Sequence, residues 1–262
     1  SEPLVDMLPG MGAVSQSAQR VLGMVLWFNR CGRLDISVAT SMLCSIVSRW
    51  QEVATKWLAH LVGYIMGSCS ENLRLSWPVQ DDRESVQVVV YCDANLATPR
   101  SRGGFIVGIE GSSGIFLPLS FSSKRQAIAS DSPTAAEFMA IHAAFKGAVL
   151  VALMMRVTKP IVVRTDSLCA IKTIDKGYTT QILWITLALG IKVSFMSDMC
   201  SRGIVCFQHI AGQTNPADQL TKLFTKARSL EQRRLVGIDS FNVEGSSVGQ
   251  DDNEDCSLAE EC

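Results

Sequence analysis

Residues 86–93 read Val86-Gln87-Val88-Val89-Val90-Tyr91-Cys92-Asp93. The run is rich in β-branched residues, so it predicts a buried strand that ends in a carboxylate. Two further apolar runs follow at 104–109 and 115–121, with glycine-containing breaks before each. Three short strands at this spacing predict an antiparallel meander.

A second apolar run that ends in a carboxylate follows a long helical segment. Asp131 or Ser132 can cap that helix, and the run 161–165 after it leads into Asp166. A strand, a long helix and a strand in this order imply a right-handed crossover and a parallel pairing. We therefore expect Asp93 and Asp166 at neighbouring strand ends.

The rest of this region predicts a helix, a longer helix, a strand and a last helix. They are expected at 167–176, 180–200, 203–209 and 216–227. The complete order predicts an α/β fold, with a mixed five-stranded sheet flanked by helices.

The other segments differ in composition. Helical periodicity at 14–28, 36–48 and 50–66 predicts a small helical subdomain before the sheet. Residues 239–262 carry eight acids and no base, a composition typical of disorder. The predicted division is an arm at 1–12, the helical subdomain at 13–66, a linker at 67–85, the sheet domain at 86–228 and an acidic, disordered tail at 229–262.

Composition excludes several protein classes. With 47% hydrophobic residues among 262, the chain can bury a core. Its nine cysteines include no Cys-x-x-Cys pair, which argues against a zinc site and favours reduced thiols in a cytoplasmic protein. No uninterrupted apolar run reaches the roughly 18 to 20 residues of a membrane span, so no membrane partner is expected.

Charge is distributed unevenly along the chain. The net charge is −1, but residues 86–225 hold 13 Lys and Arg against 8 Asp and Glu. This basic excess permits a nucleic-acid partner without requiring one.

Four carboxylates stand where a metal-dependent nuclease needs them. Besides Asp93 and Asp166, Glu137 opens the long helix, and Asp218 lies in a loop that enters a helix. Each alone is more often a turn, cap or helix-start residue. Together they suit two Mg²⁺ ions, which prefer hard oxygen ligands and can drive phosphodiester hydrolysis.

His209 lies in a glycine-containing segment nine residues before Asp218. Beside a two-metal site it can pass a proton to a leaving group. The alternative is a surface histidine at a strand end.

At this point the residues match a family. Residues 86–228 resemble the ribonuclease H (RNase H) domain of Copia-type LTR-retrotransposon polyproteins, and residues 14–66 resemble the segment between polymerase and RNase H in them. The matching segments of the first region are Tyr91-Cys92-Asp93-Ala94-Asn95, 100–105, 122–126, Ala136-Glu137-Phe138, Thr165-Asp166-Ser167, 170–171 and Asn215-Pro216-Ala217-Asp218-Gln219-Leu220-Thr221-Lys222.

The resemblance implies an RNase H-like fold and endonucleolytic cleavage of RNA in RNA–DNA hybrids. It implies metal-binding catalytic roles for the four carboxylates, with two Mg²⁺ ions for which Mn²⁺ can substitute. It further implies that Ser122, Ser123 and Lys124 lie near the substrate, that an upstream polymerase domain is a partner, and that the protein acts in the cytoplasm or within a virus-like particle.

The sequence also departs from the family pattern. The family usually has an acid at the positions of Ala135 and Asn95. The polymerase signature is absent, because Asp81 and Asp82 lack the apolar strand that would follow them. One alternative is therefore an inactive RNase H-fold module that binds hybrid or a polymerase; another is a scaffold without a nucleic-acid role.

Overall fold

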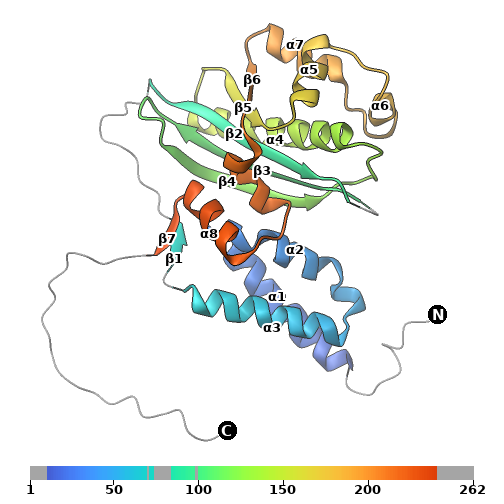
Figure 1. Ribbon diagram of the computed structural model, residues 1–262, viewed down its shortest axis with the longest axis vertical. Coiled ribbons are helices and arrows are strands. Elements are labelled where there is room, and N and C mark those ends of the chain that lie inside the picture. The colour runs from blue at the N-terminus through green and yellow to red at the C-terminus, as the bar shows by residue number, and fades with distance from the viewer. Residues whose placement is uncertain (1–10, 70, 74–83, 98–99, 241–262) are drawn as a thin grey trace, which may run out of the picture.

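The computed structural model describes residues 11–69, 71–73, 84–97 and 100–240. Its centre is a five-stranded sheet in the order β4-β3-β2-β5-β6 (Figure 1). The strands are β2 (Gln87–Asn95), β3 (Arg102–Glu110), β4 (Phe116–Arg125), β5 (Ile161–Thr165) and β6 (Val205–His209). The first three are antiparallel, while β5 runs parallel to β2 and β6 parallel to β5. The predicted mixed sheet, its meander and its parallel pairing are confirmed.

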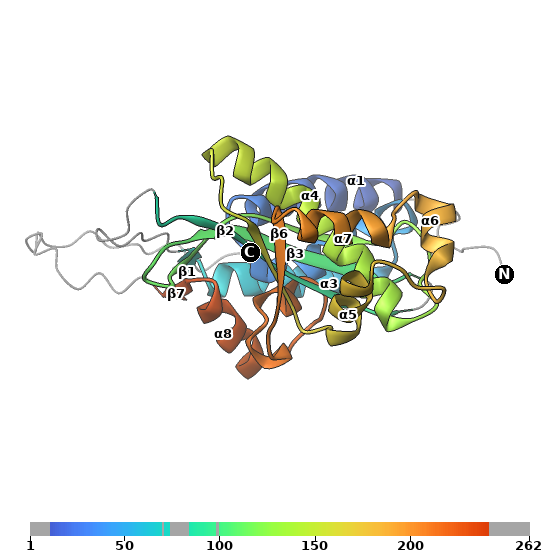
Figure 2. The same cartoon turned by 90° about the horizontal axis from the view of Figure 1, so that it is seen from above.

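Four helices lie over one face of this sheet (Figures 1 and 2). They are α4 (Pro133–Met155), α5 (Leu168–Lys176), α6 (Leu183–Leu189) and α7 (Val193–Ser201). Ser132 caps α4 by accepting the Ala135 N–H, and Arg156 ends it in the left-handed conformation. The main core forms between α4 and the sheet, from residues such as Val88, Val90, Phe138, Ile141 and Phe145.

The composition of α4 follows from this position. Its length and hydropathy would also suit a membrane span, and the bent pair α6–α7 passes the same test. Many apolar side chains of α4, such as Phe138 and Ile141, nevertheless pack on the sheet, as those of a central core helix do, whereas Leu150, Leu153 and Met154 near its C-terminal end are exposed.

The N-terminal helices pack on the opposite face of the sheet. They are α1 (Met11–Arg30), α2 (Ser37–Ser45) and α3 (Glu52–Gly67), with the short 3₁₀ turns η2 (Leu34–Ile36) and η3 (Val47–Arg49) between them. They share a core of their own. A third cluster, containing Leu34, Ile106 and Leu220, joins them to the sheet. The predicted helical part before the sheet is therefore present and is packed against it.

Two predicted helices are wrong in detail. The helix expected at 180–200 is two helices, α6 and α7, bent by 100°, because Gly190 adopts a φ of 66° and ends α6. The helix expected at 216–227 is a 3₁₀ turn, η5 (Pro216–Leu220), followed by α8 (Lys226–Leu235). Buried contacts of Leu220 and Thr221 with the sheet override the helical pattern there.

The predicted linker and tail also contain regular structure. The strand β1 (Glu71–Leu73) lies inside the expected linker and pairs antiparallel with β7 (Ile238–Ser240). The tail predicted from 229 thus begins too early, because Val236 and Ile238 are buried apolar residues within a mostly polar stretch. The arm predicted at 1–12 ends too late, because α1 begins at Met11. Residues 1–10 and 241–262 lie outside the described residues.

Candidate active site

Three of the predicted carboxylates converge at one end of the sheet. Asp93 lies near the end of β2, Asp166 directly follows β5, and Glu137 lies in the second turn of α4. One oxygen of each lies within 4.8 Å of the others. The parallel β2–β5 pairing brings the two aspartates together, and α4 crosses the sheet to add the glutamate.

The oxygens of this cluster suit a hard divalent cation. Glu137 Oε1 accepts the Ala94 N–H at 3.2 Å. Its Oε2 is buried without a hydrogen-bond partner among the described residues. Buried polar atoms are nearly always paired, so this oxygen lacks a ligand of positive character. An all-carboxylate donor set fits Mg²⁺ or Mn²⁺.

The crowding of these groups changes their titration. Burial raises the pKa of Glu137 to about 9, and the charges of Asp93 and Asp166 add to the effect. Burial also raises the pKa of Asp93 to about 6, although the Thr221 hydroxyl and Lys222 oppose it. The cluster thus holds protons when no cation is bound, and a divalent ion would favour the ionised forms.

Asp218 lies beside this cluster but is not one of its three members. Its Oδ1 accepts a hydrogen bond from Lys222 Nζ at 2.8 Å, and the same Nζ lies 3.5 Å from Asp93 Oδ2. The Thr221 hydroxyl donates to Asp93 Oδ2. Lys222 and Thr221 were not predicted as site residues. The spacing of Lys222, four residues after Asp218 in a turn, was the available signal.

Two close contacts fix η5 against the sheet. Asn215 is fully buried, and its Nδ2 donates to the Cys92 carbonyl at 3.0 Å while its Oδ1 accepts the Ala217 N–H. Gly104, which pairs with Asp93, lets η5 approach the backbone of β3. A Cβ on Gly104 would lie 2.5 Å from the Cβ of Leu220. The positions of Asp218 and Lys222 therefore depend on residue 104 being glycine, because any side chain there would push η5 away from β3.

Gly104→Ala is expected to destabilise the protein by about 1–3 kcal/mol, because the new methyl group forces η5 away from β3. The neighbouring Gly103→Ala is the matched control. Its Cβ would lie 3.5 Å from the nearest atoms, an ordinary contact, so we expect a change below about 0.5 kcal/mol. Urea unfolding of both variants measures the difference. Equal stabilities would show that η5 does not rest on Gly104.

The remaining predicted residues lie at the same end of the sheet. His209 is exposed at the end of β6, in register with Thr165, the residue before Asp166. Ser123 pairs with Gly104, two strands from Asp93, and its hydroxyl donates to the Leu220 carbonyl at 2.6 Å. Ser122 and Lys124 flank it on β4, with Lys124 exposed. Their roles toward a substrate stay predictions.

No family model matches the chain, and no curated protein matches it. Among solved structures, it is similar to foamy viral protease-reverse transcriptase in complex with RNA/DNA hybrid, at 17% identity and a TM-score of 0.47, over 76% of this chain and 25% of that one. It is also similar to the N-terminal RNase H domain of Rv2228c from Mycobacterium tuberculosis, fused to maltose-binding protein, at 15% identity and a TM-score of 0.38, over 57% and 98% of the two chains. For LC11-RNase H1 in complex with RNA/DNA hybrid the identity is 19% and the TM-score 0.38, over 52% and 94%.

The sheet order and the flanking helices are those of the RNase H-like fold. Similarity at these identities and scores establishes no function for this chain, because one fold hosts many functions.

Proposed function

We propose that the protein hydrolyses the RNA strand of RNA–DNA hybrids endonucleolytically, as a two-metal ribonuclease H. The observation that carries this proposal is the cluster of Asp93, Glu137 and Asp166, in which one oxygen of each carboxylate lies within 4.8 Å of the others; Glu137 Oε2 is also buried without a partner among the described residues. A largely buried cluster of carboxylates with shifted pKa values is costly to the fold and is typical of a functional site.

The chain's own residues have distinct tasks in this mechanism. Asp93, Glu137 and Asp166 would hold the divalent ions, with Asp218 as an outer ligand. When bound, the ions supply Lewis-acid stabilisation of the phosphate and a water of lowered pKa. Lys222 and Thr221 orient Asp93. His209, exposed at the same sheet end, would give a proton to the leaving oxygen.

The proposed substrate is an RNA–DNA hybrid, which a site of this kind would recognise by the geometry of its helix. The hybrid would be recognised through its shape, its phosphates and the 2′-hydroxyls of its RNA strand, not through its base sequence. The protein would serve as the RNase H part of a Copia-type reverse transcriptase, beside an upstream polymerase domain, in the cytoplasm or within a virus-like particle. The match of residues 91–95 and 215–222 to that family supports this context.

Cleavage of a labelled RNA strand annealed to DNA tests the function. Internal RNA fragments are expected in Mg²⁺ or Mn²⁺, none in chelator, and none when the same RNA is annealed to RNA. A hybrid that stays intact with both metals would contradict the proposal, and so would cutting that continues in chelator.

One observation favours a second candidate, an inactive module that binds hybrid. Lys222 already neutralises part of the charge on Asp93 and Asp218. A site decayed in this way would bind the labelled hybrid without cutting it, in Mg²⁺ or in chelator.

A further inference from the structure

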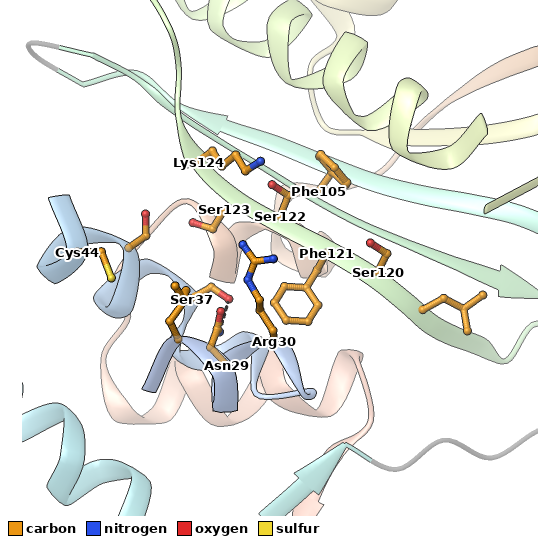
Figure 3. A pocket seen from close by; sticks show the side chains of 13 residues that line it. Asn29, Arg30, Ser37, Cys44, Phe105, Ser120, Phe121, Ser122, Ser123 and Lys124 are labelled. Atoms are coloured by element: carbon orange, nitrogen blue, oxygen red, sulfur yellow. Dashed lines mark hydrogen bonds between the residues drawn. The ribbon is translucent and has the colours of Figure 1, made fainter. Parts of the chain in front are cut away.

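A pocket of about 550 Å³ with a mixed polar and apolar lining lies apart from the carboxylate cluster, between the N-terminal helices and the edge strand β4 (Figure 3). Residues of α1 and α2 form one wall, and residues of β4 with Phe105 of β3 form the other. Figure 3 shows Arg30 extending from α1 toward Ser122 and Ser123 on β4. We call this pocket the α1–β4 groove.

The groove is positively charged and contains no carboxylate. Arg30 and Lys124 are its charged lining residues, and both are exposed. Among the described residues the side chain of neither makes a hydrogen bond or an ion pair. Behind these lining residues, the buried Arg102 donates hydrogen bonds to the hydroxyls of Ser41 and Ser123. Within the described part of the chain it has no carboxylate partner. Cations without carboxylates suit a polyanion.

The groove also presents oriented hydroxyl groups. Ser37 and Ser41 lie one turn apart on α2 and both line the groove. Ser37 accepts a hydrogen bond from Asn29 Nδ2 at 2.8 Å, and Ser41 accepts one from Arg102 at 2.7 Å. In the described structure neither hydroxyl donates a hydrogen bond; Ser37 is buried, whereas Ser41 is half-buried and can donate its proton into the groove. Serine hydroxyls and basic side chains are the groups that bind nucleic-acid phosphates.

We propose that the α1–β4 groove binds the sugar–phosphate backbone of the hybrid, beside the phosphate that is cut. This inference rests on the proposed function and extends it to the N-terminal helices, which it makes part of the substrate surface. Ser123 of the groove is two strands from Asp93 in register, roughly 10 Å at the usual strand spacing. Leu220 and Thr221 lie over β3 between these two residues, so a backbone held in the groove would pass around this segment to reach the carboxylate cluster.

The binding test uses a fluorescent hybrid in chelator, so that cleavage plays no part. Arg30→Gln and the double variant Arg30→Gln/Lys124→Gln remove unpaired, exposed cations, so the fold should be unaffected. The control is Arg20→Gln, the same charge change at an exposed position of the same helix outside the groove. Anisotropy is measured across a salt series.

Arg30→Gln is expected to weaken binding about five- to tenfold at roughly 0.1 M salt and to reduce the salt slope by about one; the double variant should reduce it by about two. Arg20→Gln should stay within about twofold. If the wild type cleaves hybrid but Arg30→Gln binds hybrid as tightly as Arg20→Gln does, the proposal that the groove binds hybrid is overturned and the proposed function stays intact. Groove-dependent binding without any cleavage would support the groove and overturn the catalytic proposal.

A native thiol gives a second measurement at the same place. Cys44 lines the groove, whereas the exposed Cys69 does not. Bound hybrid should slow alkylation of Cys44 severalfold, followed by peptide mass spectrometry, and leave Cys69 unchanged. Equal alkylation of Cys44 with and without bound hybrid would overturn the proposal and leave the groove to another partner, such as a protein.

Discussion

Glu137→Gln is expected to abolish hybrid cleavage and, at the same time, to make the metal-free protein more stable above neutral pH. The first effect follows from the loss of a carboxylate of the cluster, one oxygen of which is buried without a partner among the described residues. Removal of a direct ligand from a two-metal site should lower the rate by at least about 10³-fold. The second effect follows from the titration of Glu137.

The sign of the pH effect is set by the raised pKa of Glu137. In the unfolded chain a glutamate titrates near 4.5, whereas burial raises the pKa of Glu137 to about 9 in the folded protein. Between these values the folded state binds more protons than the unfolded state. The free energy of unfolding therefore falls as pH rises, by about 1.4 kcal/mol per pH unit from this group. Glutamine stays neutral and removes this loss.

Urea unfolding in chelator at pH 5 and pH 8 measures the effect. The variant and the wild type should be nearly equal at pH 5, and the variant should be more stable by on the order of 2–4 kcal/mol at pH 8. Adding Mg²⁺ at pH 8 should stabilise the wild type far more than the variant, because the ion binds the ionised cluster. A variant that loses stability with pH as steeply as the wild type would show that Glu137 is ionised in the folded protein.

The sequence was sufficient for the parts of the site that lie on regular elements. Asp93 lies near the end of one apolar strand and Asp166 directly after another, and one crossover rule makes those strands parallel neighbours, so the proximity of the two aspartates could be predicted. Glu137 followed from its place at the start of a long helix. Local pattern and tertiary packing agree at these positions, which is why the expected proximity of the three carboxylates is found, while their catalytic role stays a prediction.

The segment after β6 could not be predicted in the same way. The contacts of Asn215 with Cys92 and of Thr221 with Asp93 join residues more than 100 positions apart, and no periodicity reports them. The same holds for Gly104, whose importance lies in the side chain that it lacks. The sequence predicted Asp218 as an equal fourth ligand, and only the structure shows it tied to Lys222.

Asp166→Asn and Asp218→Asn are therefore expected to differ, although both remove one charge from the same site. Asp166 belongs to the cluster of three, so its amide variant should lower cleavage to background, a loss of at least about 10³-fold. Asp218 lies outside that cluster and bonds Lys222, so its variant should keep roughly a hundredth to a tenth of the rate.

Single-turnover cleavage in saturating Mg²⁺ gives both rates, and hybrid binding in chelator serves as the control. Binding should persist in both variants, because the phosphate and 2′-hydroxyl contacts lie elsewhere. Asp218→Asn also frees Lys222 to pair more closely with Asp93, so raising the Mg²⁺ concentration should recover part of its activity but none of that of Asp166→Asn. Equal losses in the two variants, without recovery by Mg²⁺, would place Asp218 among the direct ligands and show that the Lys222 contact gives way when metal binds.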